Sequence, residues 1–263
     1  MPPDGHVHTQ WSWDAARGDM EASCRRAVEL GLGTIAFTEH ADFVQVFADQ
    51  RPLDPEGYLD AIERCRAAFP GLRILSGVEL GEPHLFPDAT DAVLGAGRFD
   101  RVVGSLHCVE GDSGFHDVSQ AAAWSGDRAE LVRKYLAETL QLLKSEARFD
   151  VLGHLDYFKR YWPEQEGRFD EVAFEEEYRA VLREAARRET VLEVNTTRGA
   201  EPHRGLCPGP IALGWWRDEG GRAVSFGSDA HEPAKVAAGF AFAAETVEAY
   251  GFRPADAEGF WRR

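Results

Sequence analysis

Short β-forming runs alternate along the chain with longer helical patterns, and this alternation restricts the fold more than any other feature. Strands are predicted at residues 5–8, 33–40, 73–80, 101–107, 150–155, 190–196 and 223–229, and helices at residues 20–30, 55–68, 128–147, 174–188 and 210–219. Runs such as Thr34-Ile35-Ala36-Phe37 do not alternate between apolar and polar residues, so we expect both faces of these strands to be buried. Buried strands separated by helices indicate an α/β fold with a parallel sheet, which is either a closed barrel or open and doubly wound.

The length and the charge of the chain narrow the range of functions. Seven strand–helix units account for all 263 residues, so we expect one domain over residues 1–263. The formal net charge of −16 disfavours long nucleic acids and anionic membranes as partners. The sequence shows neither an apolar run of about 18 residues that could span a membrane nor a secretory signal pattern. The cysteines form no CxxC pair, so we expect free thiols and a cytoplasmic location.

Histidines gather where the predicted strands end. Of the nine histidines, six lie at the C-terminal end of a predicted strand or just beyond it, together with two carboxylates. These residues are His6, His8, His40, His107, His154 and His231, with Glu79 and Asp229. In parallel α/β folds the C-terminal strand ends open onto one face, where active sites lie. A closed barrel gathers residues from six strands into a ring, whereas an open sheet spreads them along a line, so the pattern favours the barrel.

The same residues have the chemistry of metal ligands. Residues i and i+2 of a strand point to the same side, so His6 and His8 can share one ion. Asp229 and His231 have the same spacing. Imidazole and carboxylate groups together suit zinc, iron or manganese better than calcium or magnesium. The candidates outnumber the ligands of one tetrahedral ion, which predicts two to three divalent metals.

These motifs resemble those of the PHP (polymerase and histidinol phosphatase) superfamily. The resemblance rests on His6-Val7-His8, Glu79, His107, His154 and Asp229-Ala230-His231, and it covers residues 4–235. It implies a distorted (β/α)7 barrel with two or three metal ions at the strand C-termini. Within the superfamily the chain most resembles the stand-alone histidinol-phosphate phosphatases, on the segments Asp4-Gly5-His6-Val7-His8-Thr9, Gly153-His154-Leu155-Asp156 and Glu193-Val194-Asn195-Thr196.

The resemblance also implies a set of metal ligands. One metal takes His6, His8, Glu79 and Asp229, a second takes Glu79, His107 and His154, and a third takes Asp14, His40 and His231. Glu79 then bridges two ions. Asp14 departs from several relatives, which have histidine at this place. A carboxylate can replace imidazole as a ligand, and the alternative for Asp14 is a loop residue or a helix cap.

The resemblance and the metal chemistry together predict a mechanism. A hydroxide that bridges two metals attacks phosphorus in line, while fixed cations hold the phosphoryl oxygens. Arg160 and Arg198 are the preferred cations, since arginine suits bidentate phosphate binding, and Lys159 and Arg204 are further candidates. His203 either lines the pocket or is a solvated loop residue. Asp229 or a metal-bound water delivers the proton to the leaving alcohol, and the sequence does not choose between them.

The predicted function is therefore a phosphomonoesterase that hydrolyses L-histidinol phosphate in histidine biosynthesis. The alternative keeps the chemistry and changes the substrate to a nucleotide or a specialised metabolite phosphate. A barrel without enzymatic function is disfavoured, because all nine matched positions carry metal-competent side chains. The oligomeric state stays open, and residues 245–263 either pack back on the barrel or meet a partner.

Overall fold

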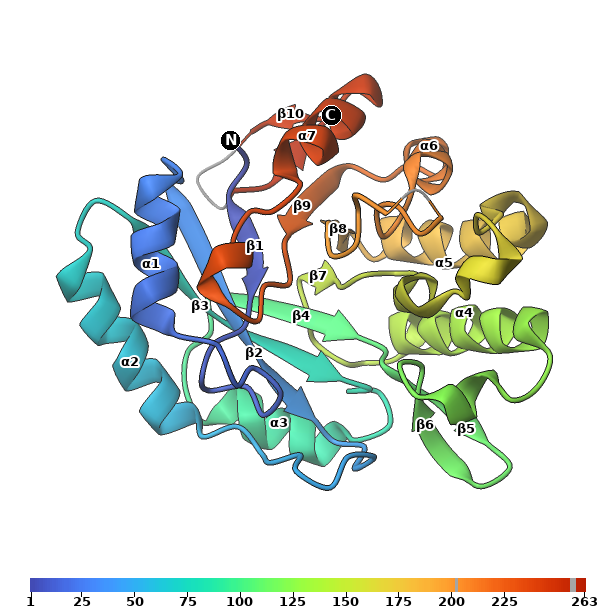
Figure 1. Cartoon of the computed structure of the whole chain (residues 1–263), viewed down its shortest axis with the longest axis horizontal. Coiled ribbons are helices and arrows are strands. Elements are labelled where there is room, and N and C mark those ends of the chain that lie inside the picture. The colour runs from blue at the N-terminus through green and yellow to red at the C-terminus, as the bar shows by residue number, and fades with distance from the viewer. Residues whose placement is uncertain (202, 256–258) are drawn as a thin grey trace.

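The computed structural model describes residues 1–201, 203–255 and 259–263, in which strands and helices alternate (Figure 1). The strands of the main sheet that run parallel are β1 (Asp4–Val7), β2 (Thr34–Asp42), β3 (Arg73–Gly81), β4 (Arg101–Ser105), β7 (Val151–Leu152), β8 (Val191–Asn195) and β9 (Ala223–Gly227). The α-helices are α1 (Met20–Glu29), α2 (Pro55–Ala68), α3 (Pro87–Gly95), α4 (Arg128–Lys144), α5 (Glu175–Arg187), α6 (Pro210–Asp218) and α7 (Phe240–Ala249).

The parallel strands form one curled sheet. Strands β1, β2, β3, β4, β7, β8 and β9 follow one another in that order in a 9-stranded sheet of the described chain. The sheet curls until the end of β1 meets the segment that follows β9, where His8 N donates to Ala230 O at 2.9 Å and Asp229 N donates to His6 O at 2.8 Å. The predicted α/β class with a parallel sheet is therefore confirmed, and the curl brings the first and the last of these strands together at the end that carries the histidines.

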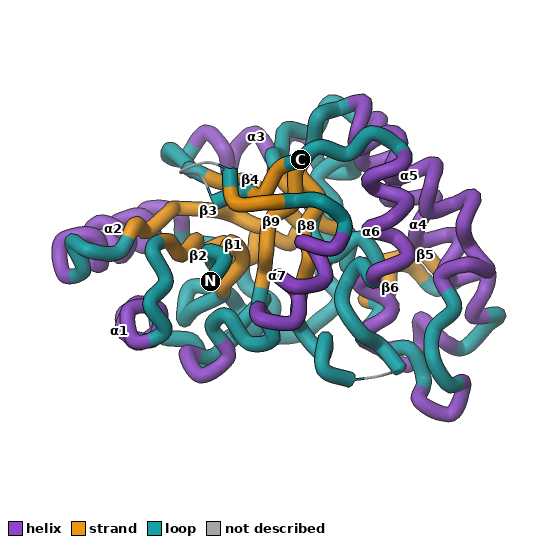
Figure 2. The backbone as a smooth tube through the Cα atoms, turned by 90° about the horizontal axis from the view of Figure 1, so that it is seen from above, coloured by secondary structure: helices purple, strands orange, loops and turns teal. Residues whose placement is uncertain are grey.

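Helices cover the outside of the sheet, as the view from above shows (Figure 2). Helix α5 illustrates why, because Tyr178, Val181, Leu182 and Ala185 recur at helical spacing and are all buried. Side-chain caps fix where several helices begin: Asp19, Asp54 and Asp127 accept backbone N–H groups at the starts of α1, α2 and α4. The five predicted helices all form, and α2 has the predicted bounds.

Three predicted strands end two or more residues earlier in the structure than in the prediction. The prediction at 101–107 ends at Ser105, that at 150–155 shortens to Val151–Leu152, and that at 223–229 ends at Gly227. In each case a buried carboxylate accepts a backbone N–H group within two residues of the strand end, where the ladder stops. Glu82 accepts from His107 N and Cys108 N, Glu193 from His154 N, and Asp4 from Ser228 N.

Several elements were not predicted from the sequence. Helices α3 and α7 and the hairpin of β5 (Cys108–Gly111) and β6 (Gly114–Asp117) fall in this group. The hairpin stands apart from the main sheet (Figure 1). Its residues near the turn are half-buried or exposed, so the hairpin lacks the apolar pattern of the core strands. Helix α3 has a single fully buried residue, Thr90, so it carries little apolar periodicity.

The C-terminal segment packs back onto the sheet. Strand β11 (Trp261–Arg262) pairs antiparallel with β9 and with β10 (Arg253–Pro254), and the Trp261 ring meets Phe226 with centroids 4.9 Å apart. The first alternative for residues 245–263 is thus the one observed, while residues 256–258 of that segment lie outside the described residues. All four cysteines are free and buried. Among the helices of the described residues, none combines the length and the hydropathy that a membrane crossing requires.

Tyr58 of α2 fastens the strands that carry two site residues. Its hydroxyl donates to Phe37 O of β2 at 2.8 Å and accepts from Gly77 N of β3 at 2.8 Å, all fully buried. We expect Tyr58→Phe to lower the free energy of unfolding by about 1–3 kcal/mol, because it leaves both backbone groups without a partner. Urea unfolding of the purified variant measures this, and a loss below about 0.5 kcal/mol contradicts the assigned role.

Candidate metal centre

His6 and His8 converge on one point from the end of β1. Their Nε2 atoms lie 2.9 Å apart, and each faces Glu79 Oε2, at 3.2 Å from His6 and 3.4 Å from His8. Asp229 Oδ1 completes the group at 3.2 Å from His8 Nε2. The opposite nitrogen of His8 lies 3.0 Å from Ser12 Oγ, which itself donates to Glu39 Oε2 at 2.6 Å. Both imidazoles are therefore fixed with Nε2 toward the carboxylates.

Glu79, from the middle of the curled sheet, is the hub of the site. Three further imidazoles reach it: His154 Nε2 at 2.8 Å from Oε1, His107 Nε2 at 3.4 Å from Oε1, and His40 Nδ1 at 3.2 Å from Oε2. Ser105 Oγ donates to Oε1 at 2.6 Å. Glu79 is fully buried. The carboxylate thus lies between five histidines that come from four strands and the loops after them.

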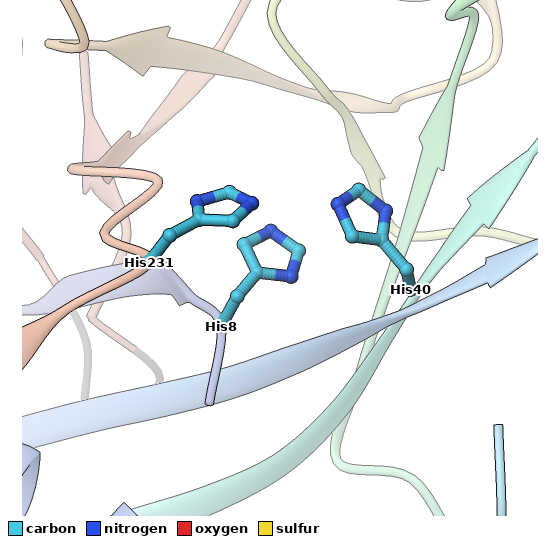
Figure 3. A group of neighbouring side chains, drawn as sticks. All are labelled: His8, His40 and His231. Atoms are coloured by element: carbon cyan, nitrogen blue, oxygen red, sulfur yellow. The ribbon is translucent and has the colours of Figure 1, made fainter. Parts of the chain in front are cut away.

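A second group gathers at the more open side of the same site. The rings of His8, His40 and His231 turn toward one another (Figure 3), with centroids 4.2 Å apart for His8–His40 and 4.4 Å for His8–His231. Asp14 joins them, since its Oδ2 lies 3.1 Å from His231 Nε2 and 3.5 Å from His40 Nε2. The structure therefore brings Asp14 to the cluster, as the resemblance implies.

The donor atoms fit divalent transition metals. Four groups in the described chain have donor atoms within 4.8 Å of one another: His8, His40 and His231; His6, Glu79 and His154; His6, His8 and Asp229; His40, Asp42 and His107. Glu79 Oε2 and His40 Nδ1 are buried and find no hydrogen-bond partner among the described residues. Buried polar atoms without partners are costly, and a cation bound between them removes that cost. Mixed imidazole and carboxylate ligands suit zinc, manganese and iron.

Electrostatics keeps the carboxylates of the centre ionised. Burial opposes ionisation, yet the nearby His6, His107 and His40 hold the pKa of Glu79 well below its usual range. Burial also opposes the ionisation of Asp229, but the charges of Arg160 and His6 hold its pKa well below normal. For His6 burial lowers the pKa, but Glu193, Glu79 and Asp229 outweigh it and raise the pKa well above normal. The carboxylates are thus ready to bind cations, and protons compete with metals for the imidazole.

Asp42 is a site residue that the sequence prediction missed. It ends β2, its Oδ1 lies 3.2 Å from His107 Nδ1, and its Oδ2 lies 3.4 Å from His40 Nδ1. Trp13 Nε1 donates to its Oδ2 at 2.8 Å. The signal was present, because His40 and Asp42 have the same i,i+2 spacing as His6 and His8. Glu193, which contacts His6, was also missed as a site residue.

The two preferred arginines have different surroundings. Arg160 is buried, its Nη2 lies 2.5 Å from Asp229 Oδ2, and its guanidinium stacks 5.0 Å from the centroid of Tyr157. Arg198 is 42% exposed and pairs with Glu201 at 3.3 Å. Both line a cavity of about 270 Å³ together with Glu79, Asp229 and His231. A neighbouring cavity of about 750 Å³ shares Arg198, Asp229 and His231 with it.

The other three candidate residues contact acidic side chains of the chain itself. His203 Nε2 is 3.7 Å from Glu201 Oε2, and the His203 carbonyl accepts from Phe169 N. Lys159 is buried between Asp156 and Glu171, at 2.9 and 3.1 Å, which explains its burial without any ligand. Arg204 pairs with Glu201. None of the three is among the residues of the described chain that line the two cavities.

A family model and several named relatives match most of this chain. The PHP domain family model matches residues 4–197. Histidinol-phosphatase from Lactococcus lactis is 28% identical over 229 residues, covering 87% of this chain and 83% of that protein. Probable histidinol-phosphatase from Clostridium acetobutylicum is 26% identical, covering 95% and 94%.

Solved structures share the fold. A crystal structure of histidinol phosphate phosphatase from Lactococcus lactis, complexed with zinc, L-histidinol and phosphate, has a TM-score of 0.84 at 24% identity and covers 96% of this chain and 94% of that chain. A putative histidinol phosphatase from Listeria monocytogenes has a TM-score of 0.81 at 21% identity, covering 91% and 99%. At these identities the likeness establishes the common fold.

Proposed function

The chain belongs to the PHP domain family, and we propose that it is a metal-dependent phosphomonoesterase that converts L-histidinol phosphate to L-histidinol and phosphate. The observation that carries the proposal is the convergence of six histidines and four carboxylates at one end of the sheet, beside a buried arginine that lines the same cavity. The relatives named histidinol-phosphatase, which match nearly the whole chain, support the choice of substrate.

We assign the ligands to three ions. His6, His8, Glu79 and Asp229 hold the first ion, Glu79, His107 and His154 the second, and Asp14, His40 and His231 the third. The short distances between the donor atoms of each set support the assignment. Zinc, manganese or iron suits these donors, and two to three divalent ions fit. Glu79 lies between the first two sets, and its two oxygens face different imidazoles, which suits a bridging ligand.

The ions, when bound, supply Lewis acidity toward the phosphoryl oxygens and activate the attacking water. The chain itself contributes position and charge. Arg160 is held rigidly by Asp229 and Tyr157, so its guanidinium offers fixed donors to the phosphoryl group. The charges of Arg160 and His6 lower the pKa of Asp229 and favour its ionised form, which suits it as a metal ligand. Arg198 stands at the mouth of the cavity and binds the phosphate on entry.

The whole chain is organised around this site. We propose that the curled sheet is a distorted (β/α)7 barrel and that residues 1–263 form one domain. The pairing of β1 with the segment after β9 supports the barrel, because it joins the two edges of the parallel strands. The unpaired, buried cysteines support a reducing, cytoplasmic location.

We expect Arg198→Ala to act mainly on substrate binding. The side chain is exposed and lies at the cavity mouth, so its loss removes an attraction that substrate and transition state share. The KM for the phosphate ester should rise about tenfold while kcat changes less than about threefold. Steady-state kinetics measure both constants. A fall in kcat with KM unchanged contradicts the assigned role.

A panel of phosphate esters tests the proposed substrate. The zinc-loaded protein is assayed for phosphate release from L-histidinol phosphate, nucleoside monophosphates and p-nitrophenyl phosphate. We expect kcat/KM for L-histidinol phosphate to exceed the others by about a hundredfold, since a dedicated site gains energy from the leaving group. Equal kcat/KM values across the panel contradict the substrate assignment. A higher kcat/KM for a nucleotide would instead support the alternative, in which the substrate is a nucleotide.

A further inference from the structure

Glu193 of β8 is a buried carboxylate that reaches across the inside of the sheet. Its Oε1 accepts from His6 Nδ1 of β1 at 2.6 Å. Its Oε2 accepts from His154 N, after β7, at 2.7 Å and from Asn195 Nδ2 at 3.2 Å. The residue is 1% exposed. A single side chain therefore ties together two residues assigned above as ligands of different ions.

The contact with His6 selects how that imidazole presents itself. A carboxylate accepts hydrogen bonds and cannot donate, so Nδ1 of His6 carries the proton. In the neutral form of the ring, which binds metals, the lone pair is then on Nε2, which faces Glu79 Oε2 at 3.2 Å and Asp229 Oδ1 at 3.7 Å. This is the nitrogen that points to the metal centre. Hydrogen bonding of the distal nitrogen to a carboxylate also makes an imidazole a stronger ligand.

The hydrogen bond between Glu193 and His154 fixes the backbone at the end of β7. The His154 N–H leaves the sheet ladder for Glu193, and this is where β7 ends. The side chain of His154 then turns to Glu79, with Nε2 at 2.8 Å from Oε1. Without an acceptor at this point the buried N–H lacks a partner, and the loop that carries His154 loses its anchor.

Gly227 of β9 provides the room that Glu193 needs. A Cβ at position 227 would lie 2.0 Å from Glu193 Oε1 and 2.8 Å from His6 Cβ. A side chain there must therefore displace the carboxylate, the imidazole or both. The position offers a way to disturb the Glu193–His6 contact without changing either residue.

We propose that Glu193 is a positioning residue of the metal centre, which orients His6 and anchors His154 so that both present Nε2 to the ions. The inference rests on the proposed function for the presence of those ions. All three partners of Glu193 are donors, so the position requires two acceptor oxygens. Glutamine has the same length but must turn an NH2 group toward at least one donor. Aspartate is shorter but keeps both acceptors.

The test is the zinc affinity of the metal-free full-length protein, measured by competition with a chelator. We expect Glu193→Gln and Gly227→Ala each to weaken at least one zinc site by about 10- to 100-fold, the usual effect of losing such a partner. Glu193→Asp should retain more affinity than Glu193→Gln. The control is Glu171→Gln, another buried carboxylate, which faces Lys159 and should leave zinc affinity unchanged while it lowers stability.

Four outcomes overturn the inference. The first two are a zinc affinity within twofold of that of the unsubstituted protein in Glu193→Gln, or in a folded Gly227→Ala. The third is tighter zinc binding by Glu193→Gln than by Glu193→Asp. The fourth is a loss of zinc affinity in Glu171→Gln equal to that in Glu193→Gln. Thermal unfolding of the metal-free variants identifies any that fails to fold, and the remaining variants then decide. The zinc measurement uses no phosphate ester. A protein that binds zinc as expected but releases no phosphate refutes the proposed function and leaves the role of Glu193 intact.

Discussion

Glu79→Gln is expected to lose zinc and nearly all phosphate release. Glu79 lies at the centre of the site, with imidazole nitrogens of His6, His8 and His154 within 3.4 Å of its oxygens. Glutamine keeps the shape of the side chain but removes its charge, and it places an NH2 group among the side chains that bind the metal ions. Loss of a partner outside the ligand set costs about 10- to 100-fold in activity, so loss of a bridging ligand should cost more than about a hundredfold.

Metal content and kcat, measured on the same preparation, check this expectation. The matched control is Glu138→Gln, because Glu138 also contacts a histidine, His84 at 2.7 Å, outside the site. The control should keep full zinc content and activity. Normal phosphate release by Glu79→Gln would refute the assignment of the centre, whatever its zinc content.

Arg160→Met should give the second largest loss. The guanidinium is buried, lines the cavity and lies 2.5 Å from Asp229 Oδ2, so methionine removes a fixed cation and leaves that carboxylate without its nearest positive partner. Because burial otherwise favours the neutral acid, the pKa of Asp229 should rise once Arg160 is gone. Fixed donors at the developing charge contribute about 10²–10³-fold to kcat, which is the loss we expect.

Steady-state kinetics at saturating L-histidinol phosphate separate this role from simple binding. Arg160→Met should lower kcat, in contrast to Arg198→Ala, which should raise KM. Arg188→Met serves as control, since Arg188 is a partly buried arginine that donates to the carbonyls of Leu143 and Ser145, remote from the cavity. A rise in KM alone in Arg160→Met contradicts a role at the reacting phosphoryl group.

Much of the fold and of the site follows from the sequence because both depend on patterns that are local. Apolar runs without alternation located the seven parallel strands, and the spacing of apolar residues located five helices. The topology of a parallel α/β fold then forces the C-terminal strand ends together. His6, His40, Glu79 and His231 meet in the structure although as many as 225 positions separate them (231 − 6).

What escaped prediction depends on contacts that are distant in sequence. Strand ends were misplaced because Glu82, Glu193 and Asp4 accept backbone N–H groups from other elements, which no local pattern reveals. The hairpin β5–β6 and helix α3 bury few side chains and so carry little periodicity. Asp42 shows the limit on single residues, because it was overlooked despite its i,i+2 spacing from His40.

The most direct test of a metal-dependent phosphatase is a titration of metal-free protein with zinc, followed by bound zinc per chain and by phosphate release from L-histidinol phosphate. We expect no phosphate release without metal, and activity that rises with bound zinc to a plateau at two to three ions per chain. Full activity in metal-free protein, or tight binding of two or more zinc ions with no phosphate release, would contradict it.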